Sequence, residues 1–344
     1  MLSKRQYFFL WILLSFILIV LFIFDIILGS VRLPFFDVLK IIFTGQTDHP
    51  EYATIIYKFR IPKALTALFA GFALSVSGLQ MQTVFKNPLA GPYVLGISAG
   101  ASLGVALLVM GLSTFTVVSQ VGVLGNWTIV LAAWMCSGLI LFLILAVSMR
   151  VKDIMTILIL GIMFGSATSA VVSILQYFSN ESMLKAFIVW TMGSLGGVSL
   201  AQLKVLIPSV VIGLLLTFLL IKALNAMMVG ENYAKSMGLN VRSSRFLIFL
   251  STSLLAGSIT AFCGPIGFIG IAVPHIARMV FKTANHKILL PGTMIFGGIV
   301  LLFSDIISQL PGYDKTLPIN SITALVGIPI VIWIIIRNQK ITAV

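Results

Sequence analysis

Apolar runs of membrane length recur along the whole sequence and limit the folds open to it. The run from 61 to 85 has only Lys63, Gln80 and Gln82 as strongly polar interruptions. At a rise of about 1.5 Å per residue, a helix of that length crosses the roughly 30 Å hydrocarbon layer of a bilayer. The expected helices are 7–29, 61–85, 93–111, 121–148, 154–178, 202–223, 243–262, 267–281, 289–308 and 320–337. The sequence therefore predicts an all-α polytopic membrane protein with about ten transmembrane helices.

Composition supports a membrane protein over a soluble one. Hydrophobic residues make up 59% of the chain and charged residues 9%, with a mean hydropathy of +1.14, whereas soluble domains carry about 25% charged residues. The net charge of +13 comes from basic residues at the ends of apolar runs. This placement indicates topology and argues against a nucleic-acid surface. Cys136 and Cys263 offer neither a disulfide framework nor a metal-ligand spacing.

The distribution of basic residues also predicts the orientation. Lys4-Arg5 precedes an apolar run longer than that of a signal peptide, which predicts a retained first helix. With ten helices, both termini lie on one side. Fourteen of the 22 Lys and Arg residues fall on that side and eight on the other, so the positive-inside rule predicts cytoplasmic termini.

Two runs carry small residues along one helical face. These are Gly71, Ser75 and Gly78 in the second run and Gly161, Gly165 and Ser169 in the fifth. Small residues let helices approach closely in a bilayer, where no hydrophobic drive pulls them together. We expect close helix packing, and for the fifth run a pathway or subunit contact is an equally open alternative.

Three stretches between the runs carry helix-breaking residues. Asn87-Pro88 ends the second helix, because proline disfavours helix at the residue before it. The segment 183–190 is too short to span and leads into glycines, and 264–270 predicts a tight turn. In the polar interval 225–245, Gly230 and Gly238 bracket about two turns of amphipathic helix.

Several motifs in a fixed order resemble the FecCD-type permeases, the membrane subunits of type II ABC importers for iron chelates, haem and cobalamin. The motifs are RxPK at 60–63, SGxQxQxxFxNPLAxP at 77–92, LGISxGA at 95–101, WxMGSxGG at 190–197, GE at 230–231 with GL at 238–239, GxIGFIG at 264–270, PHIxR at 274–278 and LPI at 317–319. The resemblance covers nearly the whole chain and implies one permease domain over 1–344 with the type II importer fold.

The resemblance also implies roles for particular residues. The external gate segment is 183–200, with hinge residues Trp190, Gly193, Gly196 and Gly197, and the cytoplasmic gate is Asn87, Pro88 and Leu89. The coupling region at 225–245 would dock an ATPase through Gly230, Glu231, Tyr233, Ala234, Met237, Gly238 and Leu239. The alternative for this region is an interfacial helix lying on lipid. Docking of a binding protein is expected at Arg60, Lys63 and Gln309. The third of these positions is basic in the family, and Lys315 is the nearby basic residue here.

The remaining polar residues are expected to be solvent-exposed or structural. Ser30 to Phe59 is expected to be a solvated connection, and its Asp48, His49 and Glu51 are more often soluble surface than a metal site. His275 and Asp305 are expected to be structural polar residues, although a proton relay is conceivable for His275.

The function that the resemblance implies is the permease half of an ABC importer. The sequence contains no Gly-Lys dipeptide and hence no Walker A phosphate cradle, so ATP and Mg²⁺ are expected only in a partner ATPase and no cofactor in this chain. A homodimer in the cytoplasmic (inner) membrane, surrounded by lipid, would work with ATPase subunits and an extracytoplasmic substrate-binding protein. An iron–siderophore complex is the first choice of cargo by family frequency, with haem or cobalamin as alternatives. An ion-coupled secondary transporter, which should carry midplane carboxylates, and a membrane receptor or scaffold are the other hypotheses.

Overall fold

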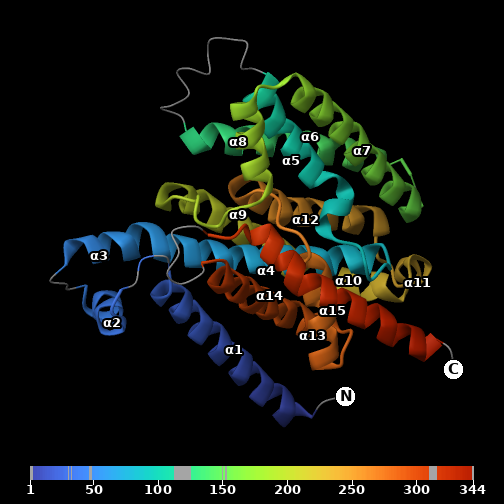
Figure 1. Cartoon of the computed structure of the whole chain (residues 1–344). Helices are drawn as coiled ribbons and strands as arrows, with labels where there is room; N and C mark the ends of the chain where they lie inside the picture. The colour runs from blue at the N-terminus through green and yellow to red at the C-terminus, as the bar shows by residue number, and fades with distance from the viewer. Residues whose placement is uncertain are drawn as a thin grey trace.

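Every element in the described part of the chain is a helix, as the computed structural model in Figure 1 shows. The structure describes residues 3–29, 31, 33–45, 49–111, 125–148, 150–151, 153–309 and 316–342. Over these ranges the prediction of an all-α protein is confirmed. Asp48 and Lys315 lie outside the described residues.

Seven helices in the described ranges are long and apolar enough to cross a membrane, and three shorter apolar helices accompany them. The long ones are α1 (Lys4–Ile27), α4 (Ile61–Val84), α6 (Gly125–Ser148), α7 (Ile154–Phe178), α9 (Leu200–Leu219), α12 (Val241–Cys263) and α14 (His286–Ser308). The shorter ones are α5 (Ile97–Ala106), which continues into the π-helical turn η3 (Leu107–Gly111), α13 (Ile269–Phe281) and the apolar part, Ile319–Trp333, of α15 (Ile319–Thr342). Each of the ten apolar runs thus contains a helix.

Helix α4 is the centre of the bundle and packs against α12, α13 and α14. Its buried polar side chain Gln80 donates to the hydroxyls of Thr217 (3.0 Å) and Ser251 (2.7 Å), and its amide oxygen accepts from Thr252 (2.8 Å). A fully buried amide is costly unless its hydrogen bonds are made. These bonds join α4 to α9 and α12 and offset the cost of burying the amide.

The small residues of α4 face other backbones, as the sequence predicts. A Cβ placed on Gly71 would lie 2.3 Å from the carbonyl oxygen of Gly297, and one on Gly78 would lie 1.8 Å from that of Gly270. A Cβ on Gly297 would in turn lie 2.2 Å from the hydroxyl of Ser75. Gly71 and Ser75 therefore fit α4 against α14, and Gly78 fits it against α13.

The stretch 30–59 differs from the predicted solvated connection. It contains α2 (Phe35–Thr44) and α3 (Pro50–Ile55), and the π-helical turn η1 (Ile56–Arg60) joins α3 to α4 without a break. The prediction failed because α2 is amphipathic: its buried Val38 and Ile41 pack in a small core with Ile56. The Tyr57 hydroxyl also donates to the carbonyl of Ile41 at 2.9 Å.

The predicted helix 202–223 is also two helices, α9 and α10 (Ile221–Val229), which meet at Leu220. Polar side chains of the two helices form hydrogen bonds with different parts of the bundle. Thr217 of α9 bonds Gln80 of α4, whereas Asn225 of α10 accepts from the backbone N–H of His286 at 2.9 Å. Helices α8 (Glu181–Thr191) and α11 (Glu231–Ser236) complete the chain between the spans.

The bundle has two ends, named here after two lysines. The Lys63 end comprises the end of α1, the start of α4 and the end of α14, and the Lys86 end comprises the end of α4 with α10 and α11. Figure 1 shows both chain termini toward the side on which α11 lies. The hydroxyl of Tyr7 in α1 also donates to the carbonyl of Phe281 at the end of α13, at 3.1 Å.

Candidate functional site

Arg60 joins α4 to the end of α1. Its side chain is 7% exposed, and its guanidinium donates to the carbonyls of Ile26 (2.9 Å), Ile27 (2.6 Å) and Val31. The last carbonyls of a helix lack intrahelical donors, so a cation at this position satisfies them and complements the helix dipole. Gly29 leaves room for it, because a Cβ there would lie 3.0 Å from the guanidinium.

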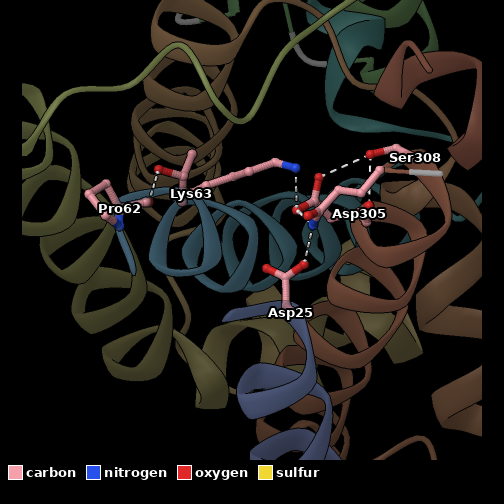
Figure 2. A network of polar contacts seen from close by, with 7 residues as sticks. Asp25, Pro62, Lys63, Asp305 and Ser308 are labelled. Carbon is pink, nitrogen blue, oxygen red and sulfur yellow. Dashed lines mark hydrogen bonds and ion pairs between the residues drawn. The ribbon is translucent and has the colours of Figure 1, made fainter. Parts of the chain in front are cut away.

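A network of buried charged and polar side chains lies beside Arg60 at the Lys63 end, and Figure 2 shows it reaching across three helices. Lys63 Nζ of α4 lies 3.1 Å from Asp305 Oδ2 of α14. The Gln309 amide donates to Asp25 Oδ1 of α1 (2.9 Å) and to Asp305 Oδ2 (3.2 Å), and the Ser308 hydroxyl donates to Asp305 Oδ1 (3.2 Å). We call these five residues the Lys63 network.

The Lys63 network brings predicted and unforeseen residues together. Arg60, Lys63 and Gln309, predicted as a docking group, do lie close to one another, but each has partners within the chain. Asp25 and Asp305 are 3% and 1% exposed, and among the described residues Asp25 Oδ2 has no hydrogen-bond partner. Acids within apolar runs are the signal that could have indicated this pairing, since such residues rarely go unpaired. The docking role of the three residues stays a prediction.

A cavity of about 640 Å³ opens beside the network. Its walls are the start of α4, residues 189 and 192–196, the end of α14 and residues 316–319. Gly196 faces the aliphatic part of Lys63, because a Cβ on Gly196 would lie 3.8 Å from Lys63 Cδ. Part of the predicted external gate segment is thus one wall of the cavity.

Backbone contacts fix the position of that segment. Gly193 has a φ of +74°, and the N–H of Ser194 donates to the carbonyl of Cys263 at 2.8 Å. The Trp190 ring stacks on Phe187, with ring centroids 6.3 Å apart. Gly197 lies beside Ser194, whose hydroxyl would be 3.9 Å from a Cβ placed there. A left-handed φ favours glycine, so the backbone explains why residue 193 is a glycine; the hinge role of Trp190, Gly193, Gly196 and Gly197 stays a prediction.

The predicted cytoplasmic gate is a short loop at the Lys86 end. It follows Lys86, which has a φ of +48°. The Asn87 side chain accepts from the backbone N–H of Leu89 at 2.9 Å, and the Pro88 carbonyl lies 2.8 Å from His275 Nε2. Leu89 itself is exposed. The helix thus ends at Val84, before the left-handed Lys86, and Asn87 stabilises the loop that follows it. The gate role of Asn87, Pro88 and Leu89 stays a prediction.

Helix α11 has the amphipathic form that the sequence predicts between Gly230 and Gly238. Ala234 is buried, whereas Tyr233 and Met237 are 52% and 63% exposed on the outer side of the helix. Glu231 pairs with Arg245 of α12 at 2.5 Å. The helix ends at Gly238, which has a φ of +83°, and the next N–H, of Leu239, donates back to the carbonyl of Ala234 at 3.0 Å. The aromatic side chain of Tyr233 and the thioether of Met237 are thus exposed, while the Glu231–Arg245 pair bonds the helix to α12.

The small residues of α7 divide into two groups. A Cβ on Gly161 would lie 2.3 Å from the carbonyl oxygen of Val94, so this glycine permits close packing. A Cβ on Gly165 would meet nothing nearer than 3.9 Å, and Ser169 is exposed. The second half of the ridge therefore remains available for a pathway or a second chain.

Residues outside the network and the gates carry little chemistry in the described ranges. No group of three or more His, Cys, Asp and Glu side chains is placed there to hold a metal, and His49 and Glu51 form an exposed pair at 3.4 Å. Asp153, which precedes α7, accepts from the Thr156 hydroxyl (2.8 Å) and backbone N–H groups. These hydrogen bonds, the hydroxyl first, hold the pKa of Asp153 below its usual value.

Comparison with known proteins fits the arrangement of the bundle. The model of the FecCD transport family matches residues 17–337. The chain belongs to the FecCD transport family. This FecCD permease is 36% identical over 285 residues to a vitamin B12 import system permease protein, BtuC, of Klebsiella pneumoniae, with 83% of each chain covered. It is 32% identical over 325 residues to an ABC transporter permease protein, YvrB, of Bacillus subtilis, with 91% of this chain and 89% of the relative covered.

Solved structures agree with the family. An inward-facing metal-chelate type ABC transporter matches the FecCD permease with a TM-score of 0.82 at 26% identity, over 97% of this chain and 100% of that one. PsaBC of Streptococcus pneumoniae, in complex with Fab, matches with a TM-score of 0.50 at 17% identity over 78% of this chain and 88% of that one, and so supports the fold alone. The chain is an ABC importer permease of the multi-pass, type II fold.

Proposed function

We propose that this FecCD permease forms the pore of an ATP-driven importer that moves a metal chelate across the cytoplasmic membrane by alternating access. The observation that carries the proposal is the pair of irregular segments at opposite ends of the bundle. Residues 192–196 border the cavity at the Lys63 end, and Asn87 to Leu89 form the loop at the Lys86 end. Alternating access needs two closures that do not open together, and these segments are the candidates.

In this proposal the Lys63 end faces outward and both termini are cytoplasmic. The excess of Lys and Arg on the side of the termini supports that orientation. Helix α11, with its exposed Tyr233 and Met237, then lies on the cytoplasmic side. There it would dock an ATPase, and ATP and Mg²⁺ would bind only to that partner.

A second permease copy would complete the pore. Helix α7 supports this part of the proposal, because Ser169 is exposed and a Cβ on Gly165 would meet nothing nearer than 3.9 Å among the described residues. Small residues on an uncovered face allow another helix to approach closely. The extracytoplasmic binding protein would sit over the cavity at the Lys63 end.

Lys63 is the better docking candidate of the two basic residues. The Arg60 guanidinium is occupied by carbonyls of the fold, whereas the Lys63 side chain is 19% exposed. A carboxylate of the binding protein could therefore replace Asp305 as the partner of Lys63, with Gln309 and Ser308 still donating to Asp305. Arg60 would contribute by holding the ends of α1 and α4 in place.

The proposal includes three cargo classes. An iron–siderophore complex is the choice by family frequency, cobalamin is favoured by the vitamin B12 relatives at 36% and 33% identity, and haem is the third. The cavity has both apolar and charged walls, so it selects none of the three. The binding protein would supply most of the specificity.

The test is ATP hydrolysis by the permease co-purified with its ATPase in proteoliposomes, with the binding protein loaded in turn with each chelate. We expect the loaded binding protein to stimulate hydrolysis and one chelate to accumulate inside. If no ATPase associates and uptake follows an imposed ion gradient, the chain is a secondary transporter and the proposal is wrong.

A further inference from the structure

Helix α13 and the residues just before it contact the two segments that the proposed function treats as gates. It follows the turn 264–268 and packs against α4, α14 and α15, and Figure 1 shows it in orange beside α14. A helix of 13 residues is about 20 Å long. Together with the turn before it, the helix can therefore link two regions of the chain that lie well apart.

His275 makes the contact with the loop at the Lys86 end. Its Nε2 lies 2.8 Å from the carbonyl oxygen of Pro88, and because a carbonyl only accepts, Nε2 carries the hydrogen. The His275 side chain is 8% exposed, so little water competes for this bond. The carbonyl belongs to the residue between Asn87 and Leu89, and fixing it fixes the turn that presents Leu89.

Helix α13 is itself held firmly on α4. Pro274 has no N–H, so the carbonyl of Gly270 lacks its intrahelical donor, and this carbonyl faces Gly78 of α4. The Gln82 amide donates to the carbonyl of Ile271 at 3.1 Å, and Arg278 donates to Gln82 at 2.6 Å. His275 is thus carried by a helix that cannot shift easily relative to α4.

The turn before α13 makes the contacts with the other gate segment. The carbonyl of Cys263 accepts from Ser194, and a Cβ on Gly264 would lie 2.5 Å from the carbonyl oxygen of Trp190. The hydroxyl of Tyr93, just beyond the gate loop, donates to the carbonyl of Ile266 at 2.9 Å and accepts from its N–H at 3.2 Å. Residues 263–266 therefore touch the segment 190–197 on one side and the chain just after the gate loop on the other.

We infer that His275 is a positioning residue that holds the loop of Asn87 to Leu89, and that α13 with its preceding turn links this loop to residues 190–197, so that a movement of one segment is transmitted to the other. This inference rests on the proposed function for the meaning of the movement. The positioning itself is a property of the permease alone.

Hydrogen–deuterium exchange of the full-length permease in nanodiscs tests the inference, comparing wild type with His275→Leu and His275→Gln. Leucine removes the donor, whereas a glutamine amide can still donate to Pro88. We expect His275→Leu to raise exchange in residues 86–95 about fivefold, the scale of one hydrogen bond, and to raise it measurably in 190–197. His275→Gln should stay near wild type. Unchanged exchange in 86–95, a glutamine variant that behaves like leucine, or a change confined to 269–281 would each overturn the inference.

A second variant guards against a general loss of structure. Tyr93→Phe removes the bonds to Ile266 and leaves His275 intact, so we expect faster exchange in 91–96 and 264–268 with 86–89 unchanged. If both variants instead raise exchange uniformly along the chain, the effect is global and positioning is refuted. Exchange needs neither ATP nor chelate, so it decides the inference even if ATP-driven uptake fails. With uptake established, His275→Leu should also lower the chelate moved per ATP hydrolysed.

Discussion

Gly78 and Gly270 approach so closely that there is no room for a methyl group on Gly78, and adding one should destabilise the bundle. A Cβ on Gly78 would lie 1.8 Å from the carbonyl oxygen of Gly270, whereas non-bonded carbon and oxygen atoms need about 3 Å or more. Gly78→Ala must therefore separate α4 from α13 by about 1.2 Å. That movement would stretch the bonds from Gln82 to Ile271 and from His275 to Pro88, which are now 3.1 and 2.8 Å long.

The expected cost follows from these two effects. Overpacking costs about 1–3 kcal/mol, and each of the two weakened hydrogen bonds adds about 1 kcal/mol, so we expect Gly78→Ala to destabilise the permease by about 3–5 kcal/mol. Gly138→Ala is the matched control, because a Cβ at Gly138 of α6 would meet nothing within 4 Å. There the better helix propensity of alanine should leave stability unchanged or raise it by up to about 1 kcal/mol.

Equilibrium unfolding in mixed detergent micelles with rising SDS measures both variants. The two substitutions add the same methyl group, so the difference between them reports the contact alone. If Gly78→Ala costs less than about 0.5 kcal/mol, the scale of an ordinary surface change, the close approach of α4 and α13 is not what the structure indicates.

Three further predictions concern the two ends of the bundle. Arg60→Gln should lower the free energy of unfolding by about 3 kcal/mol, because most of the charged bonds to the end of α1 are lost, and unchanged stability in the same assay would contradict its capping role. Lys63→Arg should retain stimulation by the binding protein in an ATPase assay, whereas Lys63→Met should reduce it at least tenfold with ATPase assembly intact; equal stimulation of both would remove Lys63 from the docking surface. Tyr233→Ala with Met237→Ala should abolish ATPase co-purification without shifting the melting temperature, since both side chains are exposed, and retained co-purification would move the docking site elsewhere.

The sequence predicts the number and type of the helices because apolar length is a direct consequence of the bilayer. It also predicts that Gly71 and Gly78 face other helices, since small residues on one face have few other uses in lipid. It does not predict α2 and α3, whose 10 and 6 residues are too few to cross a bilayer. Their burial depends on contacts such as that of Tyr57 with Ile41, which arise only in three dimensions.

The candidate site was predictable in its residues but not in their partners. Motif order places Arg60 and Lys63 at one end of the molecule, yet nothing in the spacing indicates that Arg60 holds the carbonyls of α1 or that Gln309 bridges Asp25 and Asp305. These partners are hundreds of residues apart in some cases, and one sequence carries no information on such pairs. The same is true of His275, whose partner is the carbonyl of Pro88.

Uptake into proteoliposomes tests the central claim most directly. The permease, its ATPase and the binding protein would be reconstituted with ATP inside the vesicles, and accumulation of labelled cobalamin and of a labelled iron–siderophore complex would be followed in separate assays. The account predicts that one chelate accumulates only with ATP, Mg²⁺ and the binding protein all present. Accumulation that needs none of the three, or that follows a proton or sodium gradient instead, would contradict it.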